Sequence, residues 1–270
     1  MCIRDRAMGN DLRFPEDSMC ISTKLALEDK GKLSSLQVPD PHKDGRMPAY
    51  LEVLQETKRN IPDSIVSGVI AGPWTTAIGL RGANELIRDA LKDPDYVHEL
   101  MALCSEVAIA FMEALIPLKV GLSYSEAPAS CSLISPKMYR QLIFPYHKKI
   151  MAHFKEKKVG IGLHICGYAD PILEDVVSTG VTNISIDAPS DLAKAVEVVR
   201  GKAVLIGNLD TNLFYTGSKD EMKQAIKNCI DQAPSDSGYI LSSGCEVPAI
   251  APPEKSEWFY ELVDELGGAN

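Results

Sequence analysis

The sequence lacks an excess of positive charge. Of its 270 residues, 28 are lysine or arginine and 37 are aspartate or glutamate, so the formal net charge is −9. Proteins that bind nucleic acids need clustered basic side chains to neutralise the phosphates. The charge balance therefore argues against a nucleic-acid partner.

Long apolar runs and a secretory signal are also missing. No uninterrupted apolar stretch reaches the roughly 18 residues that a transmembrane helix needs, and the charged start of the chain has no apolar core behind it. Seven cysteines lie at irregular positions, and an odd number without a regular framework is typical of a reducing compartment. We therefore expect a cytoplasmic protein with no membrane partner.

Two glycine-rich nucleotide signatures are absent as well. The first predicted strand is not followed by G-x-G-x-x-G, and G-x-x-x-x-G-K-S/T occurs nowhere in the chain. Little in the sequence therefore supports nucleotide binding.

What the chain does contain is a regular alternation of short apolar strands and capped helices. Strands are predicted at 65–71, 121–125, 159–163, 183–186, 203–206 and 239–243, and helices at 47–60, 84–91, 94–118, 136–157, 170–180, 192–200, 218–232 and 254–266. Nearly continuous apolar strands indicate a parallel sheet that is buried on both faces. A TIM (β/α)8 barrel needs eight such units. We expect an α/β fold of this type, shortened at its N-terminus to about six βα units, with a doubly wound open sheet as the alternative.

The sequence predicts one domain behind a short segment that looks foreign. Residues 1–6 match the translation of a common sequencing-adapter tail, and we expect them to be non-native, with an ordinary disordered terminus as the alternative. Residues 7–270 then form a single barrel domain that lacks its first two strands.

The most informative motif is the pair His164 and Cys166, with Cys245 in a later Ser-Gly-Cys-Glu run. Residues i and i+2 of a strand point to the same face, so His164 and Cys166 project together. If both strands belong to one parallel barrel, Cys245 approaches across the same mouth, where such barrels carry out their chemistry. One imidazole and two thiolates suit a zinc ion (Zn²⁺) with an open fourth position. We interpret the triad as a zinc site that activates a thiol; a core histidine with buried cysteines is the alternative.

Five motifs, in this order along the chain, resemble the uroporphyrinogen decarboxylase superfamily. They are Ala-Gly-Pro-Trp-Thr at 71–75, Ser-Glu-Ala-Pro-Ala-Ser at 125–130, His-Ile-Cys-Gly at 164–167, Ile-Gly-Asn-Leu-Asp at 206–210 and Ser-Gly-Cys-Glu at 243–246. Within the superfamily they are similar to the corrinoid-dependent methyltransferases, such as methylcobamide:coenzyme M methyltransferases. In that branch a His-x-Cys and a later Cys hold a zinc ion, which implies the same role for His164, Cys166 and Cys245. The resemblance also implies a TIM barrel whose relatives are longer at the N-terminus.

The resemblance implies a zinc-dependent methyltransferase of anaerobic one-carbon metabolism. Its methyl donor is a methylated corrinoid on a partner protein, and its acceptor is a small thiol such as coenzyme M. Two alternatives remain, a metal-free decarboxylase of a tetrapyrrole and a non-catalytic corrinoid-binding barrel. The strand ends carry almost none of the basic residues that the decarboxylase needs, and the intact triad argues against the non-catalytic barrel.

Further candidate site residues lie near the ends of the predicted strands. Asp187 occupies a position similar to an acidic ligand of cobalamin-independent methionine synthase, and it is a candidate fourth ligand or a group that steers the substrate. Glu126 precedes Ala-Pro-Ala, where we expect no capping function, so it is the second candidate for catalysis. Substrate contacts or support of the metal ligands are expected of Trp74, Thr75, Tyr124, Asn208, Asp210 and Glu246. A helix cap remains the alternative for Asn208 and Asp210, and a core position for Tyr124.

Overall fold

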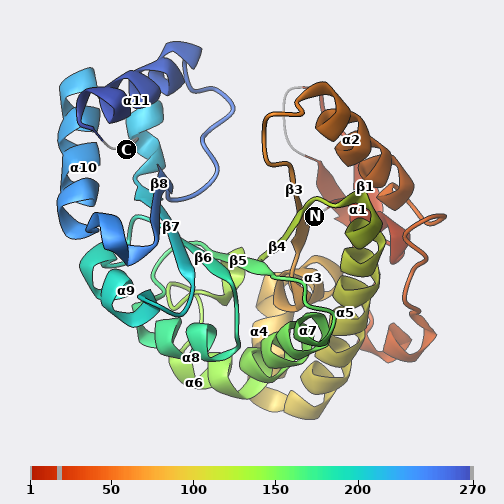
Figure 1. Cartoon of the computed structure of the whole chain (residues 1–270). Helices are drawn as coiled ribbons and strands as arrows, with labels where there is room; N and C mark the ends of the chain where they lie inside the picture. The colour runs from red at the N-terminus through yellow and green to blue at the C-terminus, as the bar shows by residue number, and fades with distance from the viewer. Residues whose placement is uncertain (1, 17–19, 268–270) are drawn as a thin grey trace. The chain divides into compact units, whose positions relative to one another are not determined.

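The computed structural model describes residues 2–16 and 20–267, which form two compact units. The first contains residues up to 129 together with 137–161, and the second contains 130–136 and the residues from 162 onward. Figure 1 labels the elements of both units.

The first unit begins with elements that the sequence analysis did not predict. They are α1 (Cys2–Ala7), the antiparallel strands β1 (Asp11–Arg13) and β2 (Ile21–Lys24), and the 3₁₀ helix η1 (Lys30–Ser35). The two strands are short and almost entirely exposed, so they carry no apolar pattern that could reveal them. Residues 2–6 lie in α1, where the buried Arg4 pairs with Asp5 and donates a hydrogen bond of 2.8 Å to the Ala71 carbonyl.

A pair of parallel strands forms the centre of the first unit. β3 (Ser67–Ala71) follows α2 (Met47–Asn60) and pairs with β4 (Gly121–Ser125). Between the two strands lie α3 (Pro73–Arg81), α4 (Ala83–Lys92), α5 (Pro94–Leu115) and the 3₁₀ helix η2 (Ile116–Leu118). After β4 come the 3₁₀ helix η3 (Ala127–Ala129), α6 (Pro136–Met138), the π-helix η4 (Tyr139–Ile143) and α7 (Phe144–Glu156).

The helix α5 is the main core helix of this unit. The Asp93 carboxylate caps its first turn by accepting a hydrogen bond from the Tyr96 N–H, and Pro94 opens the helix. Residues 94–118 are long and apolar enough to cross a membrane, although acidic residues interrupt the apolar run. However, 61% of the most apolar window is buried inside the structure, and a buried core helix passes the same test. The helix is therefore weak evidence for a membrane span.

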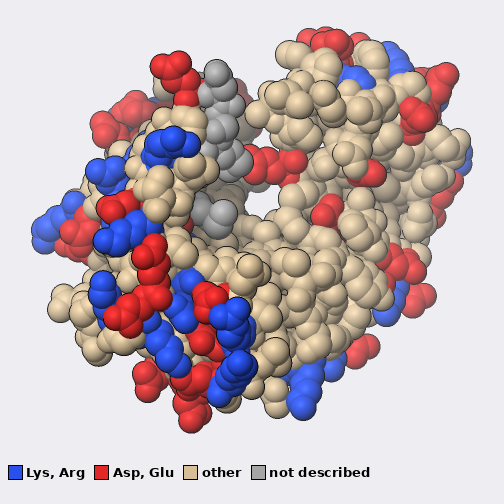
Figure 2. Space-filling model, turned by 180° about the vertical axis from the view of Figure 1, so that it is seen from behind, with Lys and Arg blue, Asp and Glu red and all other residues tan. Residues whose placement is uncertain are grey.

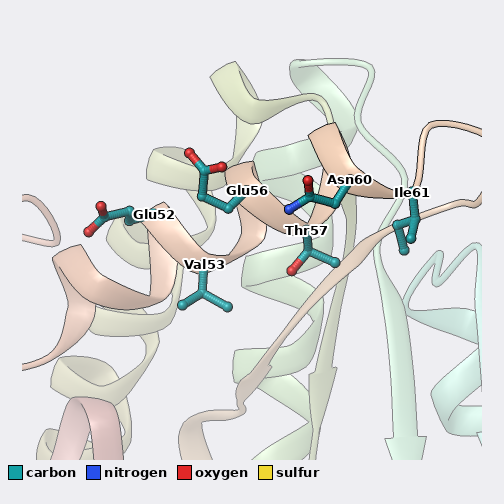
Figure 3. Close-up of a pocket in the computed structure, with 6 residues that line it drawn as sticks. All are labelled: Glu52, Val53, Glu56, Thr57, Asn60 and Ile61. Carbon is teal, nitrogen blue, oxygen red and sulfur yellow. The ribbon is translucent and has the colours of Figure 1, made fainter.

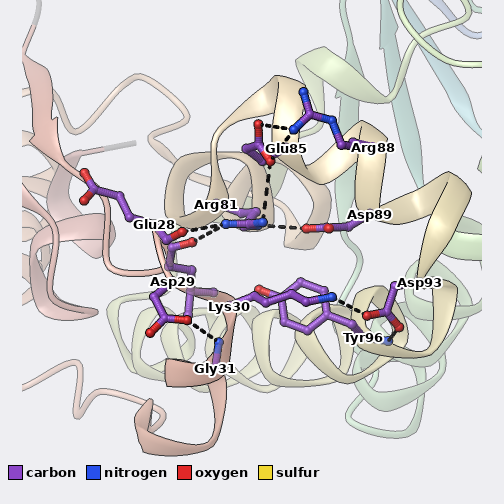
Figure 4. A network of polar contacts seen from close by, with 11 residues as sticks. Glu28, Asp29, Lys30, Gly31, Arg81, Glu85, Arg88, Asp89, Asp93 and Tyr96 are labelled. Atoms are coloured by element: carbon purple, nitrogen blue, oxygen red, sulfur yellow. Dashed lines mark hydrogen bonds and ion pairs between the residues drawn. The ribbon is translucent and has the colours of Figure 1, made fainter.

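A polar network fastens the segment around η1 to α3, α4 and α5 (Figure 4). The Arg81 guanidinium, 8% exposed, donates to an Asp89 carboxylate oxygen at 2.8 Å and to the carbonyls of Leu27 and Glu28, each at 2.9 Å. Nearby, Lys30 pairs with Asp93. Because one buried arginine satisfies acceptors on two distant segments, it fixes a stretch of chain that has little regular structure of its own.

The second unit contains a parallel sheet of four strands in chain order. They are β5 (Gly162–Ile165), β6 (Asn183–Ile186), β7 (Val204–Leu209) and β8 (Tyr239–Ser243). The intervening and final helices are η5 (Asp170–Ile172), α8 (Leu173–Ser178), α9 (Leu192–Val199), η6 (Thr211–Phe214), α10 (Lys219–Gln232), η7 (Ser235–Ser237) and α11 (Pro253–Glu265). β5 and β7 are buried at most positions, as the nearly continuous apolar pattern predicts. In contrast, β6 alternates buried with partly buried residues, and none of the residues of β8 is fully buried.

The six predicted βα units are present, with local differences of which three bear on the candidate site residues. β5 lies three residues later in the chain than predicted at its start, so His164 is inside the strand. β7 continues to Leu209, because Asn208 pairs with Ser242 of the neighbouring strand. α3, which is absent from the predicted helices, begins at Pro73, because a proline at the first helical position opens a helix.

The surface seen from behind shows no concentration of basic side chains. On that face, lysine and arginine alternate with aspartate and glutamate, and no continuous basic patch is visible (Figure 2). This distribution agrees with the negative net charge of the chain. Both observations argue against a nucleic-acid partner.

Candidate metal centre

Three soft donor atoms converge in the second unit. Cys166 Sγ lies 3.0 Å from His164 Nε2 and 2.9 Å from Cys245 Sγ, and Cys245 Sγ lies 3.7 Å from the same imidazole nitrogen. His164 comes from β5, Cys166 follows that strand directly, and Cys245 follows β8. All three side chains are partly buried. The sequence analysis predicted this grouping, and the structure brings the three residues together.

The spacing of the donor atoms fits a small tetrahedral cation. Zinc–sulfur bonds of about 2.3 Å and zinc–nitrogen bonds of about 2.0 Å place ligand atoms roughly 3.5–3.8 Å apart. The three donors lie within 4.8 Å of one another, and two of their separations are shorter than this tetrahedral spacing. Small side-chain rotations would therefore suffice to admit an ion between them.

The charges around the triad also favour a cation. Burial is the main cause that raises the pKa of Cys166 well above its usual value, and Cys245, Asp187 and Glu246 raise it further. Burial likewise lowers the pKa of His164, against smaller opposing effects of Asp187 and Ser185. The neighbouring groups that act on the Cys166 thiol are all acidic, so a bound metal ion would supply the positive charge that two thiolates require.

Ser185 holds the imidazole in the orientation that a metal ligand needs. It is the direct partner of His164 in the register between β5 and β6, and its hydroxyl lies 3.0 Å from His164 Nδ1. Since Nδ1 is engaged by this hydroxyl, Nε2 is the nitrogen that faces the two sulfur atoms. The sequence analysis missed Ser185, although its place two residues before Asp187 in the next strand was visible.

Asp187 lies beside the triad and binds backbone rather than side chains. Its Oδ2 accepts a hydrogen bond of 2.8 Å from the N–H of Gly167, the residue after Cys166, and its Oδ1 accepts one of 2.7 Å from the Ala188 N–H. The carboxylate therefore supports the loop that follows Cys166. A role as fourth ligand or in steering the substrate stays a prediction.

The other three residues predicted near this site have different surroundings. Asn208 is 9% exposed and donates to two backbone carbonyls, those of Asp187 and Ser190. Asp210 caps the 3₁₀ helix η6 by accepting from the Asn212 N–H at 2.9 Å, which is the capping alternative. Glu246 is exposed, and its charge acts on Cys166.

The remaining predicted residues lie in the first unit and are buried around a carboxylate. Glu126 accepts hydrogen bonds from the N–H groups of Trp74 (3.0 Å) and Thr75 (2.8 Å) at the start of α3, and from the Thr75 hydroxyl at 2.8 Å. It also contacts His147 Nε2 at 3.2 Å, and the ring of Tyr124 packs edge-on against His147. The expectation that Glu126 has no capping function was wrong, because the carboxylate caps a helix that lies about fifty residues earlier in the chain.

Glu126 and the predicted residues around it are shielded from solvent. The four predicted residues in this unit are at most 4% exposed, and burial holds the pKa of Tyr124 well above its usual value. Tyr124 Oη has no hydrogen-bond partner among the described residues. Catalytic or substrate-binding roles for Trp74, Thr75, Tyr124 and Glu126 stay predictions, while their observed contacts are structural. His147, which the sequence analysis assigned no role, completes the buried network.

A separate hollow of about 450 Å³ lies along α2 (Figure 3). It is lined by Glu52, Val53, Glu56, Thr57, Asn60 and Ile61. None of the predicted site residues lines this hollow, and its two carboxylates are exposed.

Comparison with protein families gives a match over nearly the whole chain. The family described as uroporphyrinogen decarboxylase (URO-D) matches residues 1–266. The chain is 28% identical over 229 residues to the methylcobamide:CoM methyltransferase MtbA of Methanosarcina acetivorans, covering 84% of this chain and 65% of that protein. It is 26% identical over 224 residues to MtaA of Methanosarcina barkeri, covering 82% and 64%. A uroporphyrinogen decarboxylase of Prochlorococcus marinus is 30% identical over 220 residues, covering 78% and 62%.

These relatives are longer than the chain, which spans just under two thirds of their length. Among solved structures, a methyltransferase from Methanosarcina mazei matches with a TM-score of 0.88 at 23% identity, covering 99% of this chain and 78% of that one. At this identity the likeness shows the fold. It confirms the predicted α/β fold and is consistent with a TIM-type barrel.

Proposed function

The chain belongs to the uroporphyrinogen decarboxylase (URO-D) family, and on this premise we propose that it transfers a methyl group from a methylated corrinoid protein to a thiol, with zinc at the triad. The observation that carries the proposal is the convergence of His164, Cys166 and Cys245, whose donor atoms lie within 4.8 Å of one another. The first relatives are methylcobamide:CoM methyltransferases, which supports the same assignment. Three cysteine and histidine ligands leave a fourth position for a substrate, as in catalytic zinc sites.

The chemistry follows from the donor set. A zinc ion held by His164, Cys166 and Cys245 would keep an acceptor thiol as thiolate near neutral pH. Such a thiolate would accept the methyl group by in-line displacement: the sulfur–carbon bond would form as the carbon–cobalt bond breaks, with the electron pair of the broken bond remaining on cobalt. The chain contributes orientation, since Ser185 fixes the imidazole and Asp187 fixes the loop after Cys166. Because the reaction needs reduced thiols, we propose a cytoplasmic location.

A tetrapyrrole decarboxylase is the second candidate, because uroporphyrinogen decarboxylases are also among the relatives. The two candidates differ in their need for metal. The methyltransferase requires the triad and is inhibited by chelators, whereas the decarboxylase requires neither. A cluster of two thiols and an imidazole has no evident task in a metal-free decarboxylase.

The test is metal content followed by transfer activity. Protein purified without chelators is analysed for metal beside His164→Ala, Cys166→Ser and Cys245→Ser, with Cys104→Ala as the control, because Cys104 is a buried cysteine that is absent from the triad. We expect about one zinc per chain in the parent and the control, and a large loss in each triad variant. Methylcobalamin with coenzyme M then serves as the assay, followed by the loss of methylcobalamin absorbance. A folded parent without metal would overturn the proposal and favour the decarboxylase.

A further inference from the structure

The loop that carries Cys166 is held by side chains from other segments of the second unit. The Gly167 N–H donates to Asp187 Oδ2 (2.8 Å), the Tyr168 N–H to Ser132 Oγ (2.9 Å) and the Ala169 N–H to Ser190 Oγ (3.0 Å). Three successive backbone amides thus each have a side-chain oxygen as acceptor. Two of these acceptors belong to the same short turn after β6, residues 187–190.

Ser190 makes two contacts with this loop. Besides accepting from Ala169, its hydroxyl donates to the Gly167 carbonyl at 3.1 Å, and the residue is 4% exposed. The turn itself is held from β7, where the Asn208 amide donates to the carbonyls of Asp187 (3.3 Å) and Ser190 (2.9 Å). Because the amide nitrogen of Asn208 donates to these two carbonyls, that nitrogen serves the turn rather than a substrate.

The loop that carries Cys245 rests on the same turn. A Cβ atom added at Gly244 would lie 2.8 Å from the Ala188 nitrogen and 2.9 Å from Asp187 Oδ1. Gly244 is therefore in contact with the turn, and only glycine fits there. Gly167, which follows Cys166, and Gly244, which precedes Cys245, therefore both contact the turn at residues 187–190.

From these contacts we propose that residues 187–190, locked by Asn208, form a brace that sets the separation of the two sulfur atoms. Ser190 and Asn208 are positioning residues of the proposed metal centre, and neither belongs to the His164, Cys166 and Cys245 triad that would hold the ion. This inference rests on the proposed metal site, and it replaces the substrate-binding role that the sequence predicted for Asn208. Removal of a partner that orients metal ligands costs about 10–100-fold in metal affinity.

The experiment compares Ser190→Ala and Asn208→Ala with the parent. Ser190→Thr tests rescue, because it keeps the hydroxyl. Ser178→Ala is the control, because the Ser178 hydroxyl donates to a carbonyl of its own helix, that of Asp175. Zinc affinity is measured by competition with a chelating dye, and the absorption spectrum of the cobalt(II)-substituted protein reports the ligand geometry. We expect about 10–100-fold weaker zinc binding and an altered cobalt spectrum in the two alanine variants, near-parent values in Ser190→Thr and no change in Ser178→Ala.

A second measurement tests the brace in protein that contains no metal. Amide hydrogen exchange of residues 167–169 is followed in metal-free protein, where Ser190→Ala is expected to exchange these amides faster than the parent. Parent protein that binds no zinc would overturn the proposed function, while faster exchange would still support the brace. Unchanged exchange, or alanine variants with parental zinc affinity and cobalt spectrum, would overturn the brace. A lower melting temperature with a parental cobalt spectrum would likewise show a merely structural role.

Discussion

Glu126 offers the clearest test of a structural against a catalytic role. In Glu126→Ala the N–H groups of Trp74 and Thr75, both in buried residues, lose their acceptor. An unsatisfied buried donor costs roughly 1–3 kcal/mol, so two of them cost roughly 2–6 kcal/mol. For a chain of this size, 1 kcal/mol corresponds to about 2–4 °C in melting temperature, which gives an expected decrease of roughly 4–24 °C.

Gly72→Ala perturbs the same contact from the other side. A Cβ atom at Gly72 would lie 2.4 Å from the Glu126 carboxyl carbon, so it would push the carboxylate away from α3. Both changes disrupt the same contact, that of the Glu126 carboxylate with the start of α3. The double variant Gly72→Ala/Glu126→Ala should therefore be destabilised by less than the sum of the two single effects. Asp210→Ala is the control, because it removes an exposed cap and should cost only about 1 kcal/mol.

The assay is thermal unfolding at one pH and one heating rate, with methyl transfer measured on the same samples. A Glu126→Ala protein that melts within about 2 °C of the parent would refute the reasoning from burial and hydrogen bonds. A Glu126→Gln protein that melts like the parent but has lost methyl transfer would instead establish the catalytic role predicted from the sequence.

Three further predictions concern metal, pH and the network around η1. A chelator should lower the free energy of unfolding of the zinc-loaded parent by about 2.7 kcal/mol at a zinc concentration of 100 Kd, and the melting temperature with it. The chelator should leave the melting temperature of Cys166→Ser unchanged; equal shifts in the two proteins would contradict the triad. Hydrogen bonds from Lys157, and to a smaller extent from His153, lower the pKa of Glu113 from its usual value. The ionised carboxylate therefore stabilises the fold at pH 7, and this stabilisation is lost as the pH falls through the lowered pKa. The difference in stability between parent and Glu113→Gln should therefore shrink in acid, and a difference that does not change with pH would contradict this. Arg81→Lys should lose roughly 1–3 kcal/mol and expose the segment around η1 to proteases, since lysine cannot reproduce the guanidinium fork; an unchanged cleavage pattern would exclude this role.

The sequence predicted the βα units well because each is encoded locally. Apolar strands, caps and prolines lie within ten or twenty residues of one another, and they gave all six strands to within three residues at their starts. The hairpin β1–β2 was missed because its strands are exposed and therefore lack an apolar pattern. α3 was missed because Gly72-Pro73 is as typical of a loop as of a helix start.

The site residues that depend on nearby sequence were predictable, whereas those that act through contacts with distant segments were not. The triad was predictable because catalytic zinc needs rare residue types, and the i, i+2 spacing of His164 and Cys166 defines one face of one strand. Ser185 and Ser190 were not predictable, since serine is common and each acts through register with a strand or loop about twenty residues away. The cap by Glu126 joins residues 51 and 52 positions apart, which no local pattern encodes.

Asn208 is a residue whose predicted role differs from its observed contacts, and the difference bears on the proposed reaction. Its polar side chain at a strand end suggested a contact to the tail of a substrate, but its amide nitrogen donates to the carbonyls of residues 187 and 190. Asp187 and Asn208, at the ends of β6 and β7, therefore hold the backbone next to the triad, which agrees with the proposed role as positioning residues. Among the residues predicted near the triad, Glu246 is the exposed one whose charge acts on Cys166. If the second unit selects the acceptor thiol by charge, Glu246→Gln should change the relative rates with cationic and anionic thiols, whereas Asn208→Ala should weaken zinc binding without changing that preference.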